Sequence, residues 1–106
     1  MTDNRTHRRI AFSRIAEAAL DCSHTIVQRW LPDGKRSGTE WVSRNPTRDD
    51  RHPGSFKVNL ATGAWADFAT SDAGADLVSL AAYLFQLRQG EAALRVAQML
   101  DADPYE

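Results

Sequence analysis

The spacing of apolar residues divides the chain into three parts. In residues 8–31, apolar side chains recur every three or four positions, which is the spacing of one helical face. This stripe comprises Phe12, Ile15, Ala19, Cys22, Ile26 and Trp30. Residues 21–23 can cap a second helix within it, so the pattern fits either one long helix or two shorter ones. Pro32-Asp33-Gly34 then favours a turn and ends this helical part.

The middle part, residues 38–69, is predicted to form a small antiparallel sheet. Residues 39–44 are a first candidate strand. In residues 56–60 apolar side chains alternate with polar ones, which is the period of a half-buried strand. Ala61-Thr62-Gly63 can close a hairpin, with Gly63 supplying a positive φ, and residues 64–68 form the returning strand.

The last part, residues 76–100, is helical again. Asp76 is a suitable N-cap for a first helix, and Gln89-Gly90 separates it from a second helix that begins at Glu91. We therefore predict an α+β fold in which a small antiparallel sheet is flanked by N-terminal helical structure and two C-terminal helices. The 106 residues are expected to form a single domain with a loose polar segment at residues 1–7.

Composition narrows the class of protein. Apolar residues make up 42% of the chain and charged residues 25%, as in ordinary globular proteins. No apolar run approaches the roughly 20 residues that span a bilayer, and the arginines near the start precede no apolar signal segment. Cys22 is the single cysteine, which excludes an internal disulfide and suits a reducing compartment. We expect a cytoplasmic protein that does not associate with membranes.

Charge is unevenly distributed along the chain. Residues 1–57 hold eleven Lys and Arg against seven Asp and Glu, whereas residues 58–106 hold two against seven. Cations clustered around the predicted strands can meet phosphate, but they can equally form a solvated surface. The isoelectric point near 6.3 argues against a strong free-standing DNA-binding protein.

Four short motifs follow one another between residues 45 and 77. They are Asn45-Pro46-Thr47-Arg48, Gly54-Ser55-Phe56-Lys57-Val58, Trp65-Ala66-Asp67-Phe68 and Gly74-Ala75-Asp76-Leu77. Their order resembles the zinc-ribbon domain of bacterial-type DNA primases. In that family a Cys-Pro-x-His knuckle precedes a Ser-Phe strand, and a Cys-Phe-x-Cys knuckle precedes Gly-Asp and an apolar helix. The lead-in over residues 29–42 looks more like the primase-helicases of phages, plasmids and integrated elements.

The resemblance places the four metal-ligand positions at Asn45, Arg48, Asp67 and Thr70. None of them is Cys or His, whereas structural zinc requires four nitrogen or sulfur donors. A second donor set, Cys22 and His24 with His7 or His52, is disfavoured because Cys22 lies on the apolar stripe. We therefore expect no metal and no other cofactor. The ribbon is expected to be held by burial of its aromatic residues instead, namely Trp30, Trp41, Phe56, Trp65 and Phe68.

The same resemblance implies an accessory module that binds single-stranded nucleic acid, DNA in the first place, during replication of a mobile element. The candidate phosphate contacts are Arg44, Arg48, Arg51, His52 and Lys57. Trp41 and Trp65 are either core residues or, on an open sheet face, stacking platforms for bases. The alternative is a protein-interaction module that docks on a replicative primase, helicase or polymerase.

Catalytic motifs are scarce in this sequence. It contains no Gly-x-x-x-x-Gly-Lys phosphate loop, and no carboxylate cluster of the kind that nucleotidyl transfer needs. We therefore do not expect the chain to be an enzyme by itself. Whether it is a whole protein or the front of a longer primase-helicase stays open.

Overall fold

The computed structural model describes residues 8–106, and the prediction of a loose segment at residues 1–7 lies outside this range. The N-terminal stripe forms two helices, α1 (Phe12–Leu20) and α2 (Ser23–Trp30), so the second of the two alternatives is correct. Cys22 and Asp21 lie at the break between the helices, where the predicted capping residues stand. Within the described part of the chain, no helix has the length and apolar character to cross a membrane.

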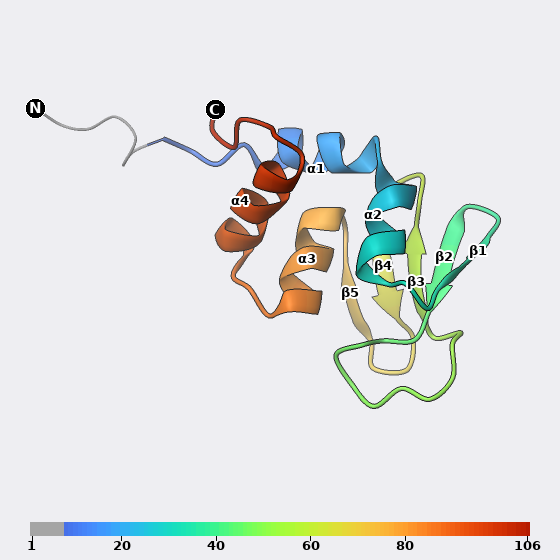
Figure 1. Ribbon diagram of the computed structural model, residues 1–106. Helices are drawn as coiled ribbons and strands as arrows, with labels where there is room; N and C mark the ends of the chain where they lie inside the picture. Colours follow the sequence, from blue (N-terminus) through green and yellow to red (C-terminus); the bar gives the residue numbers. More distant parts are fainter. Residues whose placement is uncertain (1–7) are drawn as a thin grey trace, which may run out of the picture.

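Five antiparallel strands form a single sheet in which each strand pairs with its neighbours in sequence (Figure 1). They are β1 (Lys35–Ser37), β2 (Glu40–Ser43), β3 (Phe56–Asn59), β4 (Trp65–Asp67) and β5 (Asp72–Gly74). The sequence predicts the three inner strands but neither edge strand, and the sheet is wider than residues 38–69. Short edge strands with exposed side chains carry no alternation that a pattern can detect.

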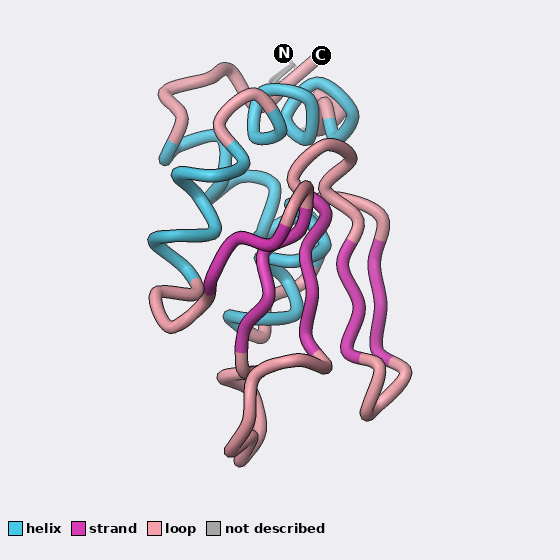
Figure 2. Tube along the Cα trace, turned by 90° about the vertical axis from the view of Figure 1, so that its right-hand side faces the viewer, coloured by secondary structure: helices cyan, strands magenta, loops and turns pink. Residues whose placement is uncertain are grey.

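The two faces of the sheet differ in character. On β3 the side chains of Phe56 and Val58 are buried, whereas those of Lys57 and Asn59 point to the other side. Trp41 on β2 and Trp65 on β4 both pair with Val58, so all three belong to the buried face. The helices cover this face, and Figure 2 shows the strands with the helices behind them and to one side. No element of residues 8–106 covers the opposite face, and its exposed side chains are described below.

Two C-terminal helices, α3 (Leu77–Phe85) and α4 (Gln89–Met99), complete the α+β fold. Asp76 caps α3 as predicted: its carboxylate accepts a hydrogen bond from the backbone N–H of Ser79, and the Ser79 side chain bonds back to the cap residue. The interruption between α3 and α4 falls at Gln86, which has a left-handed φ of 55°, and not at the predicted Gln89-Gly90. Helix α4 begins at Gln89, before the predicted start at Glu91.

Each sheet tryptophan lies against a glycine that has no room for a side chain. The Trp41 indole N–H donates to the Leu31 carbonyl at 3.0 Å, and a Cβ at Gly34 would lie 2.0 Å from the Trp41 Nε1 atom. Likewise, Trp65 donates to the Ser79 hydroxyl at 2.9 Å, and a Cβ at Gly74 would lie 2.4 Å from its ring nitrogen. Close contact between backbone and indole therefore ties both ends of the sheet to the helical layer.

We predict that Gly34→Ala destabilises the protein by about 1–3 kcal/mol, because the new methyl group must displace the Trp41 ring from a filled core. Chemical denaturation measures the change. The control is Gly90→Ala in α4, where a Cβ would lie 3.4 Å from the nearest atom and alanine favours the helix. Equal stability of the two variants would contradict the proposed role of the close contact.

Candidate nucleic-acid interface

The four positions that the resemblance assigns to metal ligands lie close together in the structure. Asp67 stands at the centre: it is fully buried at the end of β4, on the face that the helices cover. Asn45 lies two residues after the end of β2 and is also buried, and Arg48 lies further along the same loop. We call the group formed by Asn45, Arg48, Asp67 and Tyr83 the Asp67 network.

The carboxylate of Asp67 accepts hydrogen bonds from three directions. Arg48 Nε donates to Oδ2 at 2.9 Å, and Asn45 Nδ2 donates to the same oxygen at 2.8 Å. The backbone N–H of Ala69 donates to Oδ1 at 2.9 Å. A buried carboxylate is stable only when it is paired and hydrogen-bonded in this way, so Arg48 is the charge partner that Asp67 requires.

The network continues from Asn45 to helix α3 and to the edge strand β5. Asn45 Nδ2 also donates to the Tyr83 hydroxyl at 2.8 Å, and that hydroxyl donates to Asp72 Oδ2 at 2.9 Å. The Thr70 hydroxyl reaches the same oxygen at 3.1 Å, so the fourth ligand position is linked through Asp72. Hydrogen bonds thus connect the loop after β2 and the turn after β4 with helix α3. They do so at the positions that the resemblance assigns to metal ligands.

The electrostatic balance at Asp67 favours the charged form. Burial by itself raises the pKa of a carboxyl group, but the hydrogen bonds from Arg48, Asn45 and the Ala69 backbone outweigh it and hold the pKa of Asp67 well below its ordinary value of 3.8. The same pairing raises the pKa of Arg48. Arg48 is therefore paired with Asp67, and its contact with nucleic acid stays a prediction.

These residues do not fit a zinc ion. The nitrogen atoms of Asn45 and Arg48 are hydrogen-bond donors to Asp67, whereas a metal requires atoms with a free lone pair. In the part of the chain that the structure describes, no three side chains of His, Cys, Asp or Glu gather as a metal site would need. His7, one of the alternative donors, lies outside that part. We find no buried side-chain polar atom without a partner there, so the network is complete as it stands.

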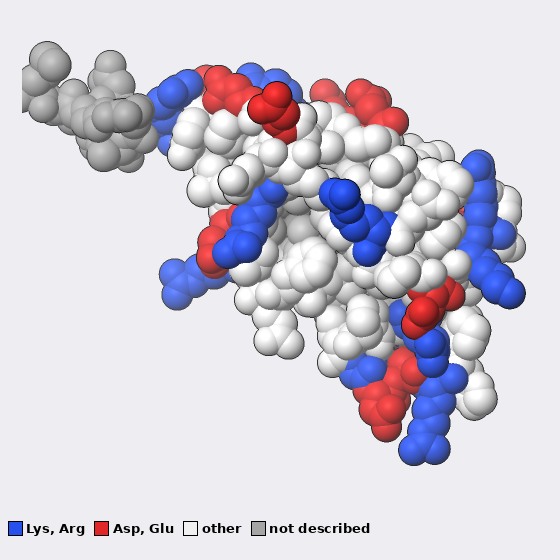
Figure 3. Space-filling view, in the orientation of Figure 1, with Lys and Arg blue, Asp and Glu red and all other residues white. Residues whose placement is uncertain are grey.

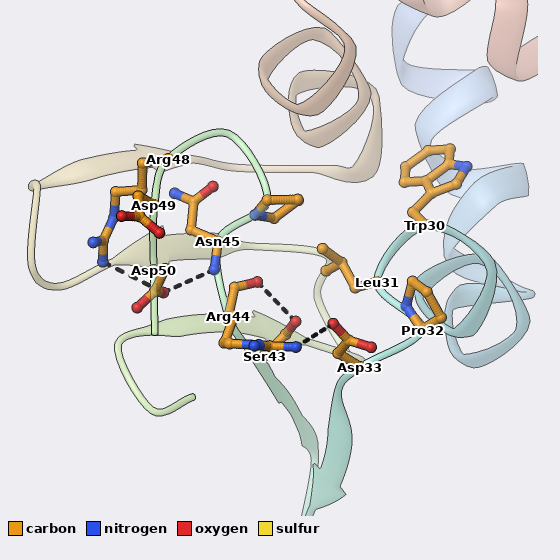
Figure 4. A pocket seen from close by; sticks show the side chains of 11 residues that line it. Trp30, Leu31, Pro32, Asp33, Ser43, Arg44, Asn45, Arg48, Asp49 and Asp50 are labelled. Carbon is orange, nitrogen blue, oxygen red and sulfur yellow. Dashed lines mark hydrogen bonds and ion pairs between the residues drawn. The ribbon is translucent and has the colours of Figure 1, made fainter. Parts of the chain in front are cut away.

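A cavity of about 190 Å³ lies beside the network, between the end of α2 and the loop that follows β2 (Figure 4). Two arginines and three aspartates line it, and the arginines are paired. Arg44 contacts Asp33 at 2.6 Å, and Arg48 contacts Asp50 at 3.5 Å in addition to Asp67. Because carboxylates outnumber cations here, the cavity is a poor site for phosphate. Arg44, a predicted phosphate contact, lines this cavity and is paired with Asp33.

The two tryptophans proposed as stacking platforms are buried. Trp41 and Trp65 are each 6% exposed and belong to the hydrophobic core, so their interpretation as core residues is confirmed. The Trp65 ring packs 4.6 Å from that of Tyr83 and stacks on Phe56, at an angle of 10° between the rings. Neither indole faces solvent, and a base has no access to them in this fold.

An exposed aromatic residue instead lies on the uncovered face of the sheet. Phe68 was expected in the core, but 70% of its surface is exposed. It is the first residue of the turn after β4, and its ring lies beside Lys57 on the face opposite Asp67 and Trp65. The sequence held a signal for this exposure. In the predicted strand 64–68, Trp65 and Phe68 are three positions apart, and residues an odd number of positions apart lie on opposite faces of a strand.

Cations stand on the same uncovered face. Lys57 Nζ lies 5.8 Å from the centre of the Phe68 ring, within cation–π range. Lys35 pairs with Val42, which in turn pairs with Lys57, so both lysines point to this side. A shallow hollow of about 220 Å³ lies between Lys57 and Phe68, with Glu40 at its border. We call the surface formed by Lys35, Glu40, Lys57, Asn59, Ala66 and Phe68 the open face.

The remaining predicted residues lie in the loop between β2 and β3. Arg51 and His52 are exposed, and within residues 8–106 neither side chain makes a hydrogen bond or an ion pair. Lys57 points to the open face, whereas the side chain of Arg48 reaches Asp67 on the buried side, so the candidate phosphate contacts do not share one surface. Lys35 was missed because strand β1 itself was not predicted.

We predict that the purified protein contains no stoichiometric zinc and unfolds at the same temperature with and without a chelator. The physical reason is that hydrogen bonds within the Asp67 network hold the two loops. Elemental analysis and a thermal melt in EDTA measure both quantities. One tightly bound equivalent of metal, or melting on chelation, would refute the assignment.

We further predict that Arg48→Ala lowers the thermal midpoint by at least about 5 °C at neutral pH, because it leaves the buried Asp67 carboxylate without its cation. Arg51→Ala, in the same loop but exposed, is the matched control and should change little.

The pH dependence of this loss follows from the lowered pKa of Asp67. A lowered pKa stabilises the folded protein above the ordinary value of 3.8, and this contribution is lost as the pH falls below that value. The difference between wild type and Arg48→Ala should therefore be largest near neutral pH and should shrink below pH 3.8. Urea unfolding between roughly pH 3 and 7 measures it, and a difference that is constant with pH would mean that Arg48 acts through packing alone.

Comparison with known proteins supports the fold and leaves the family open. No protein-family model and no curated protein matches the chain. Among solved structures, it is similar to the zinc-binding region of the Aquifex aeolicus primase, in a crystal structure of that protein's zinc-binding and RNA polymerase domains. The TM-score is 0.71 at 18% identity, over 90% of this chain and 22% of the other. This chain therefore has a fold like that of a primase zinc-binding domain, built around a hydrogen-bonded network.

Proposed function

We propose that this chain binds single-stranded nucleic acid through its open face, as an accessory module of a primase-type replication protein. The observation that carries the proposal is Phe68, an aromatic ring 70% exposed beside the ammonium group of Lys57. An exposed phenylalanine next to a cation is the combination that proteins use to bind single strands: the ring stacks on a base, and the cation meets the phosphate.

The geometry around Phe68 supports this arrangement. The backbone N–H of Phe68 donates to the Ser55 carbonyl at 2.9 Å, which holds the residue beside β3. Lys35 stands two strands away from Lys57 on the same side. Strands lie about 4.8 Å apart, so the two lysines are separated by roughly 10 Å, a distance that one extended nucleotide chain can bridge. Glu40 lowers the positive potential between them and favours weak rather than tight binding.

The replication context comes from the fold. A solved structure with a similar fold is that of a primase, and this chain spans 22% of it. Template contact is the role that the sequence resemblance implies for such a ribbon, and it is the role we propose here, with DNA as the first candidate ligand. The chain would then act beside a catalytic partner, and we propose no catalysis by the chain itself.

A second candidate is docking on a replicative primase, helicase or polymerase without contact to DNA. It is favoured by an observation on the helical side of the molecule, where apolar side chains are exposed at Phe12 and Phe85. The two candidates use different surfaces, and variants on each surface can therefore separate them.

We predict that Phe68→Ala weakens binding of a labelled oligonucleotide on the order of tenfold, because stacking of a base on an aromatic ring contributes about 1–3 kcal/mol. The double variant Lys35→Ala/Lys57→Ala should weaken it as well and should also reduce its dependence on salt. Each phosphate contact that is lost lowers the slope of log K against log salt by about 0.7. Fluorescence anisotropy across a salt series measures both effects.

Phe12→Ala, an exposed aromatic residue on α1, is the matched control for Phe68→Ala and should bind as the wild type does. Wild-type affinity in folded open-face variants would contradict the proposal and favour the second candidate. Binding that is lost equally in the Phe12 control would point to an effect on the fold.

A further inference from the structure

A groove of about 460 Å³ runs along the helical side of the molecule, remote from the open face. Its lining comes from three helices and the turn between the last two, and consists of Trp30, Ala81, Phe85, Leu87, Val96 and Met99, with Arg95 at the border. Trp30 and Phe85 form an edge-to-face pair with ring centres 5.5 Å apart, yet Phe85 remains 50% exposed. The volume lies in the range of known ligand-binding pockets.

Arginines lie in or next to the lining of this groove: Arg95 is part of it, Arg29 precedes Trp30 and Arg88 follows Leu87 in the sequence. Arg29 on α2, Arg88 before α4 and Arg95 on α4 are all exposed, and none of them pairs with a carboxylate within residues 8–106. Glu91 stands one turn before Arg95 as the single acidic side chain of α4. Figure 3 shows white surface in the region between α2 and α4 with blue Lys and Arg side chains on either side of it. The groove is thus apolar along its floor and positive along its borders.

We infer that this groove binds an amphipathic helix of a partner protein, with apolar side chains on one face and Asp or Glu beside them. Grooves between helices receive such segments through anchors spaced at i, i+3 or i+4, and i+7. The flanking arginines select acidic residues next to those anchors, because charge complementarity at the border of an interface sets the specificity and the association rate. This inference does not rest on the proposed binding of nucleic acid, since the two surfaces share no residue.

Neither a second copy of the chain nor its own termini supplies this occupant. The acidic tail is already held by its own chain: Arg14 donates to the Asp103 carbonyl at 2.9 Å, and Tyr105 pairs with Ile10. Residues 1–7 contain one apolar residue, Met1, and lack the apolar anchors that the groove needs. The helices of a second copy carry few acidic residues, with Glu17 alone on α1 and Glu91 alone on α4.

The test is a selection of 16-residue peptides from a phage-displayed random library on the full chain. We expect enrichment of sequences with the helical apolar spacing and with Asp or Glu beside the anchors. A synthetic labelled copy of the most enriched peptide should bind with saturation and should shift the indole N–H signal of Trp30 in NMR spectra. The indole signals of Trp41 and Trp65, which are buried elsewhere, should stay in place.

Variants then locate the site. Phe85→Ala should weaken binding of that peptide at least about tenfold, as removal of a central aromatic anchor does. The double variant Arg29→Ala/Arg95→Ala should weaken peptide binding about three- to tenfold, mainly by lowering the association rate constant. Because both residues are exposed, this variant tests the site even if Phe85→Ala fails to fold. Lys57→Ala, on the open face, is the control and should leave the affinity unchanged.

Three results of the peptide experiments would overturn the inference. They are the absence of enrichment, enrichment of basic or non-helical peptides, and binding that survives both groove variants. Self-association of the protein that disappears in Phe85→Ala would also overturn it, by assigning the groove to a second copy. A loss of oligonucleotide binding in Lys57→Ala with intact peptide binding would separate this surface from the nucleic-acid face.

Discussion

The pairing of Asp67 with Arg48 and Asn45 is the interaction on which the arrangement of this fold depends. A buried carboxylate requires a cation and several N–H donors, and the chain supplies them from the loop after β2 and from the turn that follows Asp67 itself. The same bonds fix the end of β4 against the loop after β2, and through Tyr83 they reach helix α3. Hydrogen bonds thereby join the elements that a metal joins in a zinc ribbon.

A hydrogen-bonded network differs from a metal centre in its physical consequences. Metal binding contributes a large folding free energy and couples stability to ligand protonation and metal supply. A salt-bridged network contributes less on its own and therefore depends on the surrounding core. Here the aromatic cluster of Phe56, Trp65 and Tyr83 packs directly beside Asp67, and the tryptophans contact glycine backbone without intervening space. Burial and hydrogen bonding act together at this point, and neither suffices without the other.

The sheet divides the molecule into two surfaces with different chemistry. The open face carries a single aromatic ring among lysines, which suits a flexible polyanion whose bases can stack. The helical side carries an apolar groove bordered by arginines, which suits an ordered apolar segment with acidic flanks. Under the two proposals made above, the open face would hold a nucleic-acid strand while the groove holds a helix of a protein partner. The Asp67 network lies between them and keeps the sheet and the helices in a fixed relation.

Local patterns in the sequence determined the elements: the helical stripe, the alternation of β3, the hairpin at Gly63 and the cap at Asp76 are all properties of neighbouring residues. The same alternation implied that Phe68 faces away from Trp65. The tertiary structure alone decided the edge strands, since Lys35–Ser37 and Asp72–Gly74 extend only because a neighbour offers them backbone partners. The tertiary structure alone also decided the ion-pair partner of Arg48. Asp67 is distant from it in sequence, and only the packing of the chain brings the two side chains together. Short-range order is encoded locally, whereas the partner of a charge is set by how the chain packs.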